Sequence, residues 1–232
     1  MANIFTDDFN SYNDGNLPTQ GGWASYSNGT NFKVQGSVIY EGAKAVYNNT
    51  AADSVVTKAG TARADGAQAI YFRSVNRASW YAGRYAQVRI SKGSWGSIFA
   101  LQQFYKDGTW GYWNGSAVAT GEGTWNDGEW NSAEIEWRSS DKKARYRIND
   151  GTWTDWCLVY GQATYTNFDY IGLNFYNTSG SGGIYFDNII EAVPAGEGWA
   201  NIAKVNGLAA TNLAKVRGIA VAGIAKRRGI AV

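Results

Sequence analysis

The feature that most limits the fold of this chain is the regular succession of short apolar runs and turn signals between about residues 4 and 193. The runs are rich in β-branched and aromatic residues, and several alternate with a period of two, as half-buried strands do. No amphipathic helical stripe of useful length occurs before residue 198. The expected strands are residues 67–73, 84–90, 97–105, 133–138, 143–148, 168–176 and 183–190.

The turn residues agree with this pattern. The chain contains 29 Gly but only 2 Pro, together with 11 Trp and 15 Tyr. Asn149-Asp150-Gly151, Asn114-Gly115 and Asp107-Gly108 each separate two apolar runs, as hairpin turns do. In the run 143–148, Ala144, Tyr146 and Ile148 are expected to face a core while the intervening arginines face outward. The sequence therefore predicts an all-β sandwich or jelly roll of antiparallel strands.

The composition excludes several classes of chemistry. The chain has no His, so it has no Ser-His-Asp triad, no Cys-His nucleophile and no His-ligated zinc or iron. Its single Cys, Cys157, excludes an internal disulfide and a cysteine cluster for metal. We expect Cys157 to pack as a small apolar residue.

The pattern changes after residue 193. Residues 194–198 read Pro-Ala-Gly-Glu-Gly and are typical of a linker. Residues 199–232 contain a repeat with a period of 11 in the segments 201–209, 212–220 and 223–231. This predicts three parts: a sandwich over residues 1–193, a linker over 194–198 and a repeat tail over 199–232.

Two structures are compatible with the repeat tail. An 11-residue period is that of a right-handed coiled coil, but each repeat carries a Gly, which costs about 1 kcal/mol in a helix. A short strand, a Gly turn and a second short strand fit better. One tail offers too few apolar side chains for a core, so we expect identical tails to associate, as a homotrimer, for oligomerisation or anchoring. The residues expected at that contact are Ile202, Val205, Leu213, Val216 and Ile224.

Charge is divided unevenly along the chain. Residues 1–198 hold 15 basic and 19 acidic residues, whereas residues 199–232 hold six basic and no acidic ones. A basic tail favours an acidic partner, which can be nucleic acid, another protein or a partner subunit. The tail has no aromatic residue after Trp199, so nucleic acid is a less suitable partner. We expect no signal peptide, and no membrane-spanning segment, because no stretch approaches about 20 apolar residues.

Three segments resemble concanavalin A-like (laminin G-like) sandwich domains. They are the opening Phe5-Thr-Asp-Asp-Phe9, the block from Trp130 to Trp156, and the closing Gly183-Ile-Tyr-Phe-Asp-Asn-Ile189. The resemblance covers roughly residues 4–192 and implies a concanavalin A-like jelly-roll sandwich. That fold hosts lectins, glycanases and structural modules, so it does not by itself specify function. The tail motif I-A-K-x-x-G-[IL]-A separately resembles C-terminal repeats of bacteriophage structural proteins.

The resemblance supplies a test for catalysis. Laminarinase-like glycanases of this fold carry an E-x-D-x-x-E strand whose carboxylates flank the scissile bond. The nearest segment here is Glu134-Ile135-Glu136, which lacks the central and third acids. We therefore expect a solvent-facing acidic pair that meets Arg145 or Arg147, and a chain that is not an enzyme.

A calcium site is the one cofactor that the resemblance suggests. In jelly-roll modules of this type, calcium often bridges the first and last strands, and it takes hard oxygen ligands. Asp7 or Asp8 in the opening strand and Asp187 in the closing strand match by residue type. The alternative is that these side chains cap turns or pair with Lys and Arg.

Aromatic residues in the segment 104–113 suggest a platform for sugar rings. The candidate carbohydrate-binding residues are Gln103, Tyr105, Trp110, Tyr112 and Trp113. With a period of two, Trp110 and Tyr112 share one face and Trp113 takes the other, so at least one face is expected in the core.

The leading hypothesis from these features is a non-enzymatic bacteriophage virion structural protein, made in the host cytoplasm. It would be a capsid decoration, fibre or tail component that displays a lectin-like module and is held by its repeats. Its partners would be itself, other virion proteins and a host surface glycan. The alternatives are a carbohydrate-binding module of a cell-surface or secreted system, and a degenerate glycanase.

Overall fold

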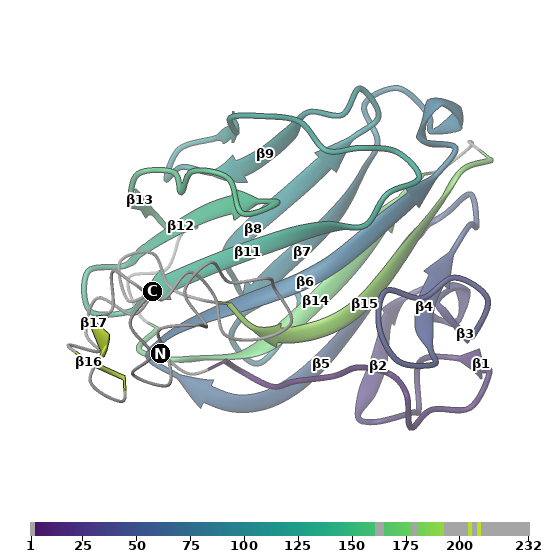
Figure 1. The fold of residues 1–232 in the computed structure, drawn as a ribbon, viewed down its shortest axis with the longest axis horizontal. Coiled ribbons are helices and arrows are strands. Elements are labelled where there is room, and N and C mark those ends of the chain that lie inside the picture. The colour runs from purple at the N-terminus through teal and green to yellow at the C-terminus, as the bar shows by residue number, and fades with distance from the viewer. Residues whose placement is uncertain (1–2, 161–164, 178–180, 193–203, 206–207, 210–232) are drawn as a thin grey trace. The chain divides into compact units, whose positions relative to one another are not determined.

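The computed structural model describes residues 3–160, 165–177, 181–192, 204–205 and 208–209 (Figure 1). The chain divides into two compact units, residues 1–192 and 193–232. Apart from two short 3₁₀ turns, Gly29–Asn31 and Arg77–Ser79, the regular elements of the described part are all strands. The prediction of an all-β fold is confirmed.

One sheet of the first unit has eight strands in the order β1-β3-β4-β15-β6-β11-β12-β13. Their bounds are β1 Gly15–Asn16, β3 Lys33–Gln35, β4 Ala45–Asn48, β15 Gly183–Glu191, β6 Asp65–Val75, β11 Asn131–Arg138, β12 Lys143–Ile148 and β13 Cys157–Leu158. All neighbouring pairs are antiparallel.

The other sheet has seven strands in the order β10-β9-β8-β7-β14-β5-β2. Their bounds are β10 Val118–Thr120, β9 Trp110–Trp113, β8 Ile98–Tyr105, β7 Tyr85–Ser91, β14 Phe168–Tyr176, β5 Asp53–Arg63 and β2 Trp23–Ser27. All of these pairs are antiparallel as well.

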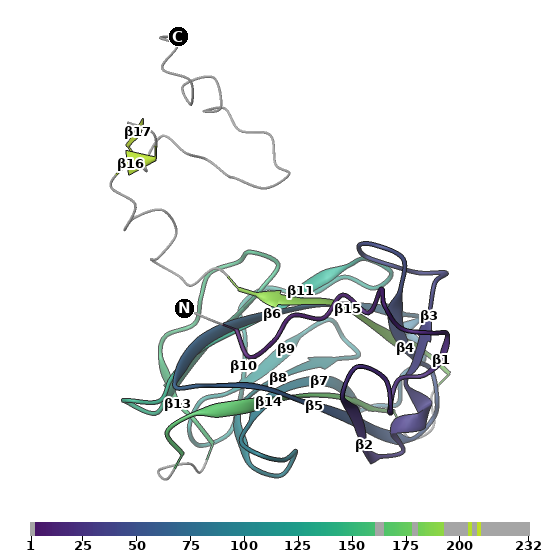
Figure 2. The ribbon, with the colours of Figure 1, turned by 90° about the horizontal axis from the view of Figure 1, so that it is seen from below.

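The two sheets lie face to face and enclose one apolar core (Figure 2). Phe72 of β6 stacks on Phe104 of β8, with ring centroids 4.0 Å apart, so the two sheets meet through their aromatic side chains. Trp125, which is fully buried, packs against both rings. Alternation along each strand sends every second side chain into this core and the others to the outer face of the sheet.

The predicted turns form with some differences in detail. Asp107-Gly108 lies in the loop between β8 and β9, and Asn114-Gly115 lies in a four-residue loop between β9 and β10 rather than a two-residue one. Asn149 and Asp150 both have positive φ, of 50° and 57°, and turn the chain after β12. The next strand, β13, begins only at Cys157, because residues 152–156 form no strand.

In the second unit, β16 (Lys204–Val205) pairs antiparallel with β17 (Leu208–Ala209). The two sequence positions between them are Asn206 and Gly207. The first repeat therefore contains two short antiparallel strands, and the predicted Gly turn between them lies outside the described residues. Val205 lies in β16, whereas the other predicted association residues, Ile202, Leu213, Val216 and Ile224, lie outside the described residues.

Candidate functional site: the outer face of the seven-stranded sheet

Three tyrosines form a row across the three central strands of the seven-stranded sheet, at one end of these strands. Tyr85 of β7 lies directly opposite Tyr105 of β8 on one side and Tyr176 of β14 on the other. Their ring centroids are 6.2 Å and 5.4 Å apart, respectively. All three alternate with core residues, so they lie on the outer face, where they are half-buried. Burial raises the pKa of Tyr85 and of Tyr105 above the usual value, so both hydroxyls are protonated donors at neutral pH.

A row of amide side chains runs beside the tyrosines. Gln87 of β7 lies opposite Gln103 of β8 and Asn174 of β14. The Tyr105 hydroxyl donates to Oε1 of Gln103 at 2.6 Å, which joins the two rows. All three amides are at most 9% exposed, and Nε2 of Gln87 has no partner among the described residues. We call the two rows together the tyrosine–amide face.

An arginine and a tryptophan continue this face by one more row. Arg89 follows Gln87 on the same side of β7, and its guanidinium lies 3.6 Å from the ring centroid of Trp95. Trp95 comes from the loop between β7 and β8 and covers Gly172, which lies opposite Arg89. A Cβ atom at Gly172 would lie 2.4 Å from the Trp95 ring, so glycine is what allows the ring to lie flat on the sheet.

We expect Gly172→Ala to displace Trp95 and to lower the free energy of unfolding by about 1–3 kcal/mol, the usual cost of overpacking. Gly96→Ala in the same loop is the control, because a Cβ there meets nothing within 4 Å and Gly96 has no positive φ. Urea unfolding of both variants measures the difference. Equal stability of the two variants would contradict the tight contact.

The five predicted carbohydrate-binding residues divide between the two sides of the sheet. Gln103, Tyr105 and Trp113 lie on the outer face, and Trp113 meets Tyr160 at a centroid distance of 4.4 Å. Trp110 is only 1% exposed and its Nε1 donates to the carbonyl of Glu122, so its assignment to sugar binding is wrong. The expectation that Trp110 and Tyr112 share a face is confirmed, and that face is the inner one.

Tyr112 is on the inner face of the seven-stranded sheet, next to a cavity. Its ring contacts Tyr146, and it lines a cavity of about 370 Å³ with Glu122, Trp153 and Asp155. Tyr112 is therefore separated from Gln103, Tyr105 and Trp113 by the thickness of the sheet.

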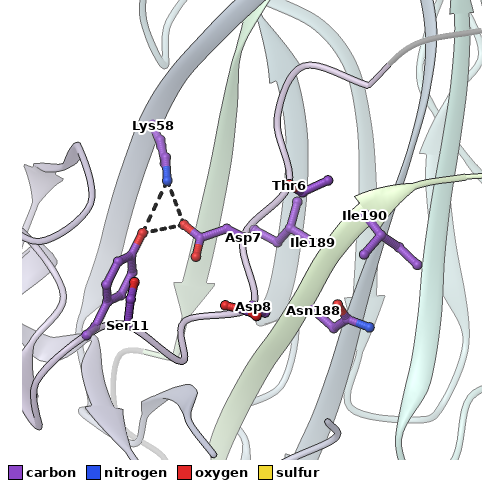
Figure 3. A pocket seen from close by; sticks show the side chains of 9 residues that line it. Thr6, Asp7, Asp8, Ser11, Lys58, Asn188, Ile189 and Ile190 are labelled. Atoms are coloured by element: carbon purple, nitrogen blue, oxygen red, sulfur yellow. Dashed lines mark hydrogen bonds and ion pairs between the residues drawn. The ribbon is translucent and has the colours of Figure 1, made fainter. Parts of the chain in front are cut away.

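The opening and closing segments are joined by mutual backbone hydrogen bonds between Asp7 and Ile189. The Asp7 carboxylate already faces a cation, because Nζ of Lys58 lies 2.7 Å from Oδ2 of Asp7 (Figure 3). The same oxygen accepts from the Tyr12 hydroxyl at 2.6 Å and from Nε1 of Trp23 at 2.8 Å. Asp7 thus ties the first segment to β2 and β5, and it lines a pocket of about 400 Å³.

Asp187 makes a different set of contacts. Its carboxylate accepts backbone N–H bonds from Tyr40, Glu41 and Asn188. These hydrogen bonds lower the pKa of Asp187, but burial has the larger effect and raises the pKa to about 6. Asp8 is exposed and accepts from the backbone N–H of Asn10. In the described part of the chain, no three His, Cys, Asp or Glu side chains are grouped to hold a metal ion, and calcium stays a prediction.

The acidic pair on β11 meets its predicted partners. Glu134 pairs with Arg147 at 2.8 Å and Glu136 with Arg145 at 2.7 Å, on the directly opposite positions of β12. The expectation that the pair faces solvent is wrong, because the glutamates are 5% and 1% exposed. Trp153 lies over both arginines and contributes to their cover.

Comparisons with known proteins support the fold. No family model and no curated protein matches the sequence. Among solved structures, a sialidase matches with a TM-score of 0.59 and 12% identity over 82% of this chain, which spans only 18% of that protein. Lectin II from Ulex europaeus matches with a TM-score of 0.51 and 12% identity over 80% of this chain and 95% of the lectin. The fold is therefore a lectin-like jelly-roll sandwich.

A third match bears on the question of catalysis. The conserved carbohydrate esterase of Shiga toxin-encoding bacteriophage phi24B matches with a TM-score of 0.51 and 14% identity, over 74% of this chain and 91% of that one. Together with the sialidase, it contradicts the prediction that the chain is not an enzyme, which rested on the incomplete acidic motif. That prediction is withdrawn.

Sequence reasoning missed most of the tyrosine–amide face. Tyr85, Gln87, Arg89, Asn174 and Tyr176 lie in segments that were recognised only as strands. The polar and aromatic side chains that alternate with core residues in 85–91 and 172–176 were the available signal. No helix in the described ranges has the length and apolar character that crossing a membrane requires.

Proposed function

We propose that the chain binds a glycan on the tyrosine–amide face. The observation that carries this proposal is the pair of rows, tyrosine beside amide, held in register across β14, β7 and β8. Aromatic rings offer flat apolar surface to the C–H faces of a sugar ring, and their hydroxyls offer a polar group at the same place. Amide side chains both donate and accept, so they match sugar hydroxyls, which do the same.

The polar groups of this face are suited to a hydrogen-bonding ligand. Nε2 of Gln87 is buried and has no partner among the described residues, and an unsatisfied buried donor is costly. Gln87 is 0% exposed, so a sugar hydroxyl would reach this donor only after the side chains that cover it move. The similarity to a lectin and to two proteins named for carbohydrate chemistry supports the same class of ligand.

We also propose that this module is part of a bacteriophage virion, as a capsid decoration, fibre or tail component assembled in the host cell. The tail repeats, with their resemblance to bacteriophage structural proteins, and the similarity to a bacteriophage esterase support this context. The glycan would then belong to the surface of the host, and the other partners would be further copies of the chain and other virion proteins.

The binding proposal predicts a loss of affinity when the tyrosine row is removed. In a screen of bacterial and eukaryotic oligosaccharides, Tyr85→Ala combined with Tyr105→Ala should weaken binding at least about tenfold, which corresponds to about 1.4 kcal/mol. Tyr47→Ala is the control, because Tyr47 stacks on Tyr185 on the eight-stranded sheet. If the double variant binds the glycan with the same affinity as the wild type, the glycan binds on another surface.

A further inference from the structure

Arg89 lies within the candidate site in an unusual environment for a charged group. Its Nε donates to Oε1 of Gln87 at 2.8 Å, and one Nη1 hydrogen points to the carbonyl of Trp95 at 3.5 Å. Its guanidinium stacks on the Trp95 ring at 3.6 Å. An arginine carries five N–H donors in a rigid plane. Three of them therefore have no protein acceptor among the described residues.

Three other partly buried cations of this domain lie beside carboxylates. The side chains of Lys58, Arg145 and Arg147 are 15–17% exposed, and each lies within 2.8 Å of a carboxylate oxygen. Arg73 and Arg77, like Arg89, have no such ion pair among the described residues, but each donates to a backbone carbonyl outside the tyrosine–amide face.

Arg89 has no carboxylate within ion-pair distance among the described residues. Burial lowers the pKa of Arg89 to about 10, so the group still carries its charge at neutral pH. The Asp53 charge acts on Arg89 from a distance and raises its pKa, but no carboxylate of the described residues contacts the guanidinium directly. A partly buried charge without a direct partner is costly, and such groups concentrate at functional sites.

We infer that the glycan bound on the tyrosine–amide face is acidic and that its carboxylate pairs with Arg89. The inference rests on the proposed function, and it specifies the class of ligand: a chain containing a uronic or a sialic acid. A planar guanidinium donates two parallel hydrogen bonds to a carboxylate. Stacking on Trp95 fixes the plane of the guanidinium. Tyr85 and Tyr105, which are half-buried on the same face, are placed to contact the same sugar.

The same charge would also attract a sulfate ester, so the test must separate the two groups. The probes are oligosaccharides immobilised in matched sets: an acidic form, its carboxyl-reduced neutral form and, where the backbone permits, a sulfated form. The proteins are full-length wild type, Arg89→Gln, Arg89→Lys and the control Arg73→Gln. Arg73 lies on β6 in the other sheet and bonds to the carbonyl of Gly128. Thermal unfolding verifies that each variant is folded.

We expect wild type to prefer the carboxylated form over its reduced form at least tenfold. Arg89→Gln should remove that preference, so that its affinities for the carboxylated and the reduced form lie within twofold of each other. Arg89→Lys, which keeps the charge but lacks the planar fork, should retain only part of the preference. Arg73→Gln should behave as wild type.

Three results would overturn the inference in distinguishable ways. If the wild type prefers neutral glycans and binding still requires the tyrosine row, the proposed function is supported and the acidic ligand is refuted. A preference for the sulfated form, or an acidic preference that persists in Arg89→Gln, would refute pairing of a carboxylate with Arg89. Absence of binding to every probe would contradict the proposed function and this inference together.

Discussion

Asp7→Ala should lower the free energy of unfolding by about 3–5 kcal/mol, the usual effect of breaking a buried ion pair from one side. The substitution leaves the Lys58 ammonium, 15% exposed, without its carboxylate. It also removes the acceptor for the Tyr12 hydroxyl, Nε1 of Trp23 and the backbone N–H of Phe9. For a domain of this size, such a loss lowers the melting temperature by roughly 10 °C.

Two further variants show whether the buried charge is the cause. Asp14→Ala breaks an exposed pair with Lys44 and should cost less than about 1 kcal/mol. Asp7→Leu combined with Lys58→Met removes both charges and should recover part of the loss, because no unpaired ion remains. If Asp7→Ala is as stable as Asp14→Ala, the hydrogen bonds and ion pair of Asp7 do not hold the opening segment to the sheet.

Removing residues 193–232 should reduce binding to a dense glycan surface about 10²- to 10⁴-fold and leave binding to a free oligosaccharide unchanged. The reason is that the predicted trimer would let three modules engage one surface together, which raises avidity without any new contact. The sandwich itself should stay folded, since residues 1–192 form a compact unit with their own core. Surface plasmon resonance on sparse and dense glycan layers measures both quantities.

A full-length variant separates association from other effects of truncation. Ile202→Asp, Leu213→Asp and Ile224→Asp together should give a monomer by analytical ultracentrifugation, with the same loss of avidity as the truncation. If tails associate without a partner, the oligomer should tighten with added salt, because screening weakens repulsion between the six basic residues of each tail. A monomeric wild type, or an oligomer that survives the triple substitution, would refute the trimer.

The strands that the sequence predicted well are those with strong apolar alternation. All seven predicted runs are strands, and β12 and β14 have the predicted bounds. By contrast, β5 is 11 residues long and was not predicted, because its second half reads Lys-Ala-Gly-Thr-Ala-Arg and lacks an apolar face. Its pairing with β14 and β2 supplies what local propensity does not, a case in which tertiary context overrides sequence preference.

The candidate site was predicted only in part, for a related reason. Gln103 and Tyr105 are neighbours of a conspicuous aromatic segment, and they were found. Tyr85 and Tyr176 come to the same place only through the order β8-β7-β14, which joins strands distant in sequence. Trp110 was misplaced because an aromatic-rich run looks alike whether its rings fill a core or a surface, and burial is decided by the opposite sheet.

The most direct test of the central claim follows the side-chain amide signals of Gln and Asn by NMR during titration with a bound oligosaccharide. If the glycan binds on the tyrosine–amide face, the signals of Gln103, Gln87 and Asn174 should shift during the titration. The dissociation constant obtained from these shifts should equal the one measured for binding. The signals of Gln68 and Asn188, which bond within the eight-stranded sheet and its neighbouring loop, should stay in place. Shifts confined to Gln68 and Asn188, with the three amides unchanged, would contradict the account.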